Sequence, residues 1–244
     1  MVLAGFEIRK ENPSQRGAAP MTAFQRYADL LIAIWIAMVV ARYRRSKVVL
    51  AGGLFAVGVY TLIALARGDV SMQALGLGSS ASWLWTSAFA AAWLALMLAY
   101  SPFADWLATR YAAKPPTLDA FRMLQESTGK LVAGVAAAWV LGGFLEELTF
   151  RGIVLQSVEG LASRRLAGSM AIGIAVCVAA AGAGLIHLYQ GLRAAIIVTQ
   201  LSVLFGVLFV VSGYDLWAVV LCHGLYDTIA FVRFANKKSK YSKL

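Results

Sequence analysis

Charged residues are scarce in this chain. Asp, Glu, Lys and Arg make up 14% of its 244 residues, whereas 60% are hydrophobic and the mean hydropathy is +0.72. A soluble domain typically carries about 25% charged residues and about 45–50% apolar ones. Because the apolar excess lies in long blocks, the composition excludes a soluble globular fold and predicts an integral membrane protein.

Seven apolar segments approach the roughly 20 residues that cross the hydrocarbon core of a bilayer. The sequence therefore predicts an all-α fold, a polytopic bundle of seven transmembrane helices, with an eighth if residues 117–130 also enter the membrane. The predicted spans are residues 30–40 with their flanks, 48–66, 83–100, 131–155, 170–188, 194–212 and 216–232. The first is the weakest, because Asp29 and Arg42 bracket a short apolar run. Thr117 follows two prolines and is expected to cap an amphipathic helix along the interface.

The sequence shows no apolar core of a cleavable signal peptide before the first span. The net charge of +10 does not indicate a nucleic-acid partner, because basic residues cluster at the ends of spans. These clusters are Arg42, Arg44, Arg45 and Lys47, and Arg233, Lys237, Lys238, Lys240 and Lys243. By the positive-inside rule we expect the C-terminal tail in the cytoplasm and, with seven spans, the N-terminus outside. Ala-rich composition and absent eukaryotic targeting signals favour a bacterial inner membrane.

Cysteine and histidine are equally rare, with two residues of each. Cys177 and Cys222 lie in apolar segments, where we expect them to be buried small hydrophobes that need no disulfide. His187 and His223 also lie in apolar segments. His187 follows a run of Ala and Gly that allows a neighbouring helix to approach closely.

Glu146, Glu147 and Arg151 share one of the most apolar stretches of the chain. A charge at the bilayer centre costs roughly 2.5–3.5 kcal/mol on insertion scales. Taken singly, each of these residues and each histidine fits a structural role. Their concentration in three apolar segments predicts one shared polar site.

The spacing of these residues suggests a division of roles. Glu147 and Arg151 are four apart on a helix, so they are expected to form an ion pair. Glu146 is offset by about 100° and stays free to act as a general base or acid. His223 and Asp227 are also four apart and are expected to share one face of the last span.

Three motifs resemble the CAAX prenyl protease and bacteriocin-processing family (CPBP, or ABI) of intramembrane proteases. Residues 146–151 read Glu-Glu-Leu-Thr-Phe-Arg and fit its Glu-Glu-x-x-x-Arg motif, followed by the typical glycine. The motif Phe-x-x-x-His falls on residues 183–187, with Ala183 in place of phenylalanine and His187 present. The motif His-x-x-x-Asn/Asp matches His223 and Asp227, where the family usually has asparagine.

The resemblance implies a helical membrane protease that hydrolyses a peptide bond without a covalent intermediate. It implies that Glu146 and His187 activate a water and that His223 and Asp227 bind the oxyanion, with Asp227 as a protonated donor. Glu147 with Arg151 would support the site, and no cofactor is expected. The partners would be the lipid bilayer and a membrane-associated protein or peptide substrate.

This interpretation divides the chain into four regions. Residues 1–27 form an N-terminal tail, 28–116 N-terminal transmembrane helices without ionisable residues at depth, 117–234 the CPBP-like catalytic core and 235–244 a basic tail.

Three alternatives remain open. Glu and His from three helices could bind a divalent metal such as Zn²⁺, although no His-Glu-x-x-His occurs. Intramembrane Glu and His also serve proton-coupled transporters, although the duplicated halves typical of transporters are missing. A non-catalytic membrane regulator or adaptor is also compatible with the departures at Ala183 and Asp227.

Overall fold

The computed structural model describes residues 22–41, 47–78 and 82–241, and the side chains of Lys47 and of residues 237–241 are outside the description. The expectations about a signal peptide and about the basic residues Arg42, Arg44, Arg45 and Lys243 therefore lie outside the described residues.

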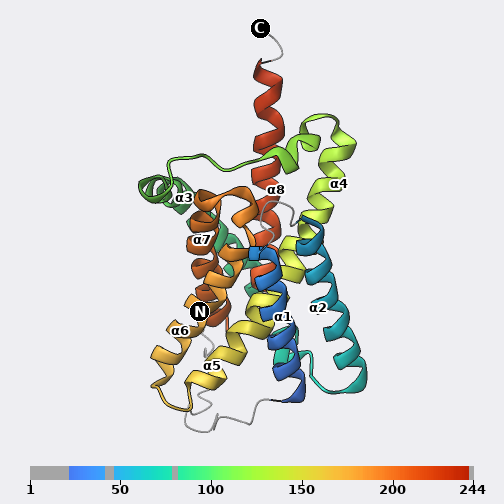
Figure 1. Cartoon of the computed structure of the whole chain (residues 1–244), viewed down its shortest axis with the longest axis vertical. Helices are drawn as coiled ribbons and strands as arrows, with labels where there is room; N and C mark the ends of the chain where they lie inside the picture. The colour runs from blue at the N-terminus through green and yellow to red at the C-terminus, as the bar shows by residue number, and fades with distance from the viewer. Residues whose placement is uncertain (1–21, 42–46, 79–81, 242–244) are drawn as a thin grey trace, which may run out of the picture.

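The described residues form an all-α bundle with seven helices long and apolar enough to cross a membrane, which confirms the predicted fold class (Figure 1). Its α-helices are α1 (Ala23–Ala41), α2 (Lys47–Arg67), α3 (Trp83–Tyr111), α4 (Thr128–Ala138), α5 (Gln156–Ala162), α6 (Gly168–Ile186), α7 (Leu192–Val211) and α8 (Leu216–Tyr241). Short 3₁₀ helices lie at η3 (Gln73–Leu75), η4 (Asp119–Gln125) and η7 (Leu188–Gln190), and π-helical segments at η5 (Trp139–Glu146) and η6 (Leu148–Leu155).

Several spans extend beyond their predicted limits. The first helix begins at Ala23, within the predicted N-terminal tail, so Asp29 lies inside this helix and is half-buried. The fourth span runs from Thr128 to Ala162 through α4, η5, η6 and α5. Apolar windows miss such ends because polar residues near an interface continue a helix without interrupting its backbone hydrogen bonds.

The segment before the fourth span differs from its prediction. Thr117 caps no helix, and the expected amphipathic helix is the short 3₁₀ helix η4. No eighth span is present among the described residues. The fourth span begins at Ser127, whose side chain accepts a hydrogen bond from the Lys130 amide at 3.2 Å. Ser127 is a typical N-cap residue, which explains why the helix starts there and not at Thr117.

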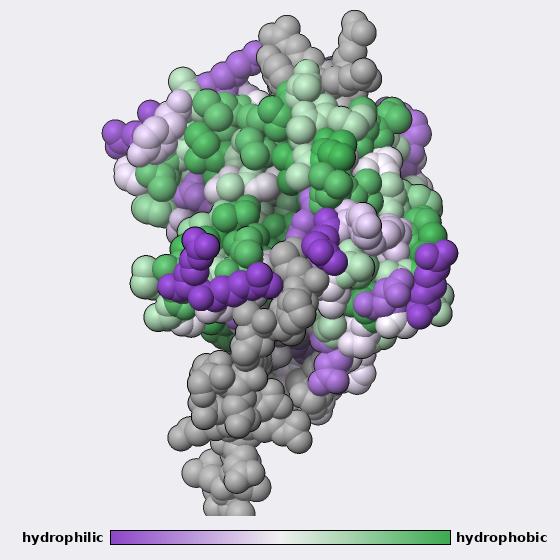
Figure 2. Space-filling model, turned by 60° about the horizontal axis from the view of Figure 1, so that its bottom comes forward, coloured by the Kyte–Doolittle hydropathy of each residue, from purple (hydrophilic) through white to green (hydrophobic). Residues whose placement is uncertain are grey.

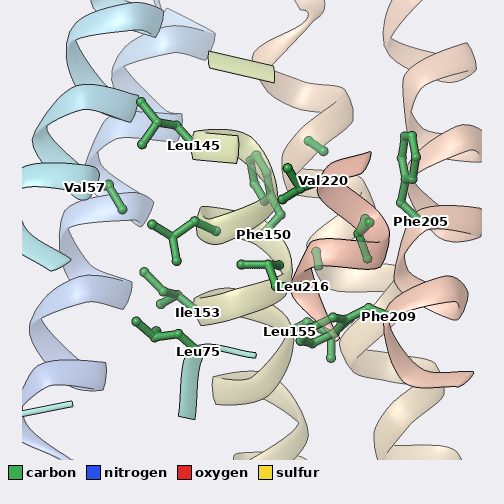
Figure 3. Close-up of a cluster of buried hydrophobic side chains, with 14 of the residues drawn as sticks. Val57, Leu75, Leu145, Phe150, Ile153, Leu155, Phe205, Phe209, Leu216 and Val220 are labelled. Atoms are coloured by element: carbon green, nitrogen blue, oxygen red, sulfur yellow. The ribbon is translucent and has the colours of Figure 1, made fainter. Parts of the chain in front are cut away.

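The buried core surrounds the π-helical segments. Figure 3 shows Leu145, Phe150, Ile153 and Leu155 among Val57, Leu216, Val220 and Phe209 from neighbouring helices. The small residues of α6 allow close packing, as Gly184 illustrates: a Cβ there would lie 1.9 Å from the Thr199 hydroxyl of α7.

Large apolar side chains also cover the outside of the bundle, among them Phe55, Leu62 and Val132. Figure 2, which brings the lower end of Figure 1 forward, shows hydrophobic residues over the flank and hydrophilic ones clustered around that end. Both cysteines are free, but Cys177 is exposed on this outer surface and only Cys222 is buried, so the expected burial of Cys177 is wrong.

Candidate active site

One cavity of about 500 Å³ brings the predicted site residues together. Glu146 reaches it from η5, Arg151 from η6 and Glu147 from between these two segments. His187 reaches it from the end of α6, and His223 and Asp227 from α8. Segments 76 residues apart in the sequence thus meet at one place, as the pair Glu147–His223 shows. Most other lining residues are apolar.

The glutamate pair lies in a π-helical stretch rather than in the regular α-helix expected from the spacing. The wider winding covers Trp139–Glu146 and Leu148–Leu155. Short π-helical bulges are rare and occur frequently at functional sites. The altered winding still brings Glu147 and Arg151 together, with Arg151 Nη1 3.1 Å from Glu147 Oε2.

Arg151 is the most strongly held charged side chain of the site. The Arg151 side chain is 2% exposed and that of Glu147 is fully buried, so the ion pair is shielded from solvent. Arg151 Nη2 also donates to the backbone carbonyl and the hydroxyl of Ser202 on α7, at 2.6 and 2.5 Å. A buried pair needs such additional hydrogen bonds to offset the desolvation of both charges.

Glu147 has a second partner that the sequence analysis did not anticipate. His223 Nδ1 lies 2.6 Å from Glu147 Oε1. A carboxylate oxygen accepts, so Nδ1 is the donor and the orientation of the imidazole is fixed. Glu147 thus connects Arg151 with His223, and its role extends beyond an isolated ion pair.

Phe205 of α7 contacts both Arg151 and His223. Its ring stacks on that of His223 with centroids 4.7 Å apart, and the Arg151 guanidinium carbon lies 5.5 Å from its centroid. Contacts of this kind combine aromatic stacking with attraction between a cation and a ring face. Neither Ser202 nor Phe205 belongs to a motif that the sequence reveals, although a serine within the apolar run of α7 is unusual.

His187 presents one ring nitrogen to the site. Its Nδ1 lies 2.8 Å from the backbone carbonyl oxygen of Ala183, and since a carbonyl only accepts, Nδ1 carries the hydrogen. In the neutral ring Nε2 is then the nitrogen that accepts a proton. The Ala183 position thus takes part through its backbone, and its side chain lines the cavity where the family has phenylalanine.

Glu146 is buried at 9% exposure, and its side chain forms no hydrogen bond or ion pair with any described residue. It lines the same cavity as His187 and His223. The sequence prediction that Glu146 is separate from the Glu147–Arg151 pair agrees with this geometry.

Asp227 faces His223 across a small gap, with its Oδ2 3.6 Å from His223 Nε2. Gly142 of η5 keeps this gap open, because a Cβ there would lie 3.1 Å from Asp227 Oδ2 and 3.6 Å from His223 Nε2. The missing side chain leaves room for an atom of a bound molecule beside both groups.

Within the described part of the chain, no three His, Cys, Asp or Glu side chains are grouped so that they could hold a metal ion. Glu147 is already engaged by Arg151 and His223, which reduces the set of free ligands.

Comparison with known proteins supports the resemblance. Residues 128–229 match the family model of Rce1-like proteins, described as type II CAAX prenyl endopeptidase Rce1-like. No curated protein and no solved structure matches the chain. The matched segment begins at the first residue of α4 and contains all six predicted site residues, from Glu146 to Asp227. Residues 128–229 are thus similar to the type II CAAX prenyl endopeptidases, whose reaction class is peptide-bond hydrolysis.

Proposed function

We propose that this chain is an intramembrane endopeptidase that hydrolyses a peptide bond of a membrane-associated protein or peptide without a covalent intermediate. The observation that carries the proposal is the single cavity lined by Glu146, His187, His223 and Asp227. Placing four ionisable groups together in an apolar bundle is costly, and such intramembrane groups are usually functional.

In the first step a water in the cavity attacks the carbonyl carbon of the scissile bond. Glu146 and Nε2 of His187 accept and hold its proton as the oxygen–carbon bond forms. Glu146 suits this role because no other described side chain engages its carboxylate. As the carbon–nitrogen bond breaks, the same proton passes to the leaving amine.

During the attack, and before the carbon–nitrogen bond breaks, His223 and Asp227 stabilise the negative charge that forms on the carbonyl oxygen. His223 Nδ1 is bound to Glu147, so the ring is held in place before substrate arrives. For this role Nε2 also carries a proton, and Asp227 donates in its protonated form. The space beside Gly142 would receive the oxygen.

The location we propose is a bacterial inner membrane, with the C-terminus in the cytoplasm. The end of α1, the start of α2 and the C-terminal end of α8 lie toward the same end of the bundle (Figure 1). The basic clusters of the sequence flank these ends, and positive charge favours the cytoplasmic side.

Cleavage of an internally quenched, S-farnesylated peptide with a CAAX-type C-terminus, measured in proteoliposomes, tests the proposal. We expect the wild type to cleave it, and Glu146→Ala and His187→Ala each to lose at least about 100-fold in kcat, as removal of a general base requires. Glu159→Ala, a glutamate outside the cavity lining, is the matched control. A cleavage rate unchanged in both active-site variants would contradict the assignment. Activity that disappears on exhaustive chelation would favour the metal-dependent version.

A further inference from the structure

Two tyrosines, Tyr189 and Tyr226, line the cavity. Their hydroxyl groups differ in whether the hydrogen is already donated to another residue. The Ser101 hydroxyl donates to the Met97 carbonyl at 2.7 Å. In the 2.7 Å contact between Ser101 and Tyr226 the tyrosine is therefore the donor. The hydroxyl hydrogen of Tyr226 is therefore already donated to Ser101 and is not free for a ligand.

Tyr189 has the opposite arrangement. Its hydroxyl oxygen accepts a hydrogen bond from Gln190 Nε2 at 2.7 Å. No described residue offers an acceptor for its hydrogen, although a phenol both donates and accepts. Tyr189 therefore brings a free O–H donor to the cavity.

The surroundings of Tyr189 fix this group close to the proposed chemistry. Its ring stacks with that of His187, with centroids 6.1 Å apart. The Thr117 amide donates to the Gln190 carbonyl at 2.8 Å, which ties the turn η7 to the segment before η4. A donor held on both sides loses little entropy when it binds a ligand.

Tyr189 lies in the turn between two spans, and its hydroxyl keeps its proton near neutral pH. Burial raises the pKa of Tyr189, and the Gln190 hydrogen bond offsets only part of this effect. The neighbouring carboxylate of Glu146 also raises the pKa of Tyr189.

We propose that Tyr189 is a substrate-binding residue that donates a hydrogen bond to a main-chain carbonyl oxygen of the bound peptide beside the scissile bond. A neutral carbonyl is the acceptor we favour over a C-terminal carboxylate, because Glu146, the proposed general base, lines the same cavity and its carboxylate repels a second anion. The inference rests on the proposed protease function.

Tyr189→Phe tests it, since this substitution keeps the ring on His187 and removes only the hydroxyl. With the farnesylated peptide we expect KM to rise about five- to tenfold while kcat stays within about twofold, the pattern of a lost binding contact. Tyr226→Phe is the matched control, and its KM should stay near that of the wild type. Binding of the same peptide to Glu146→Gln protein, followed by fluorescence anisotropy, should weaken by the same factor when Tyr189→Phe is added.

Two further comparisons distinguish a main-chain carbonyl from a C-terminal carboxylate as the acceptor, and the role of Tyr189 from the proposed protease function. Peptides with a free and an amidated C-terminus should suffer equally from Tyr189→Phe; a loss confined to the free acid would overturn the main-chain assignment. An unchanged KM in Tyr189→Phe, with wild-type cleavage intact, contradicts this inference alone. A wild type that does not cleave the peptide contradicts the proposed function, and unweakened binding to Glu146→Gln/Tyr189→Phe then contradicts the inference separately.

Discussion

The two flanks of the site are built differently. α3 is joined to α7, to α8 and to the residue before α8 by polar side-chain contacts along its length: Thr86–Asp215, Trp93–Leu204, Tyr100–Gln200, Ser101–Tyr226 and Asp105–Arg193. On the other flank α1 and α2 meet the π-helical segments through apolar contacts, such as Trp35 with Phe150 at 6.3 Å between ring centroids. Among the described residues no side-chain hydrogen bond joins α1 or α2 to η5 or η6.

This difference matters because lipid tails are as apolar as the helices they surround. Apolar packing between membrane helices therefore has no hydrophobic driving force. Hydrogen bonds and ion pairs between helices form only in one arrangement, so they determine how the helices are positioned. The polar flank holds α7 and α8, which carry Ser202, Phe205, His223 and Asp227. We infer that α3 and the buried ion network define the geometry of the site, whereas α1 and α2 enclose it.

Of the substitutions that test this difference, removal of the Arg151 guanidinium should cause the largest loss of stability. Arg151→Met leaves the Glu147 carboxylate buried beside His223, and a broken buried pair costs about 3–5 kcal/mol of unfolding free energy. Denaturant unfolding in detergent micelles measures the loss. Arg164→Met, at an exposed turn, should change stability by less than about 0.5 kcal/mol. Equal effects of the two substitutions would refute the idea that the ion network holds η6 to α7.

An intermediate effect is expected where α8 meets η5. A Cβ on Gly224 would lie 2.5 Å from the Trp139 ring, whose Nε1 donates to Thr228 at 3.0 Å. Gly224→Ala should therefore displace Trp139 and destabilise the fold by about 1–3 kcal/mol, as overpacking does. Gly173→Ala has open space around it and provides the control. Thermal unfolding of both variants measures the difference in stability. A Gly224→Ala protein as stable as the control would contradict the predicted overpacking against Trp139.

The smallest effect concerns a single polar contact of α3. Thr86 of α3 donates to Oδ2 of Asp215, the residue before α8, at 2.6 Å, whereas Thr61 donates to the Val57 carbonyl within α2. Both threonines are buried. Thr86→Val should cost about 1 kcal/mol in unfolding free energy, near the upper range for hydrogen bonds between membrane helices, and Thr61→Val less. A larger loss of stability in Thr61→Val than in Thr86→Val would contradict the idea that polar contacts of α3 position the neighbouring helices.

The sequence was sufficient for the broad architecture and for the set of residues that meet. Composition predicts the spans because the cost of burying backbone and charge in lipid acts on every window of the chain. Local spacing also predicts the Glu147–Arg151 pair, since both residues lie on one helix.

What the sequence could not supply depends on long-range placement. The bond between Glu147 and His223 joins different helices, and no spacing rule encodes it. Ser202 and Phe205 of α7 take part only because α7 packs against this pair. The π-helical winding also escaped prediction, since hydropathy alone does not distinguish it from an α-helix.

The two adjacent glutamates provide the most direct test of the account, which assigns chemistry to Glu146 and support to Glu147. Measuring kcat and unfolding free energy together for Glu146→Gln and Glu147→Gln separates these roles. We predict that Glu146→Gln loses at least about 100-fold in kcat with stability near that of the wild type, while Glu147→Gln is strongly destabilised because Arg151 and His223 lose their shared partner. A Glu146→Gln protein that cleaves the peptide with the wild-type kcat would contradict the central claim.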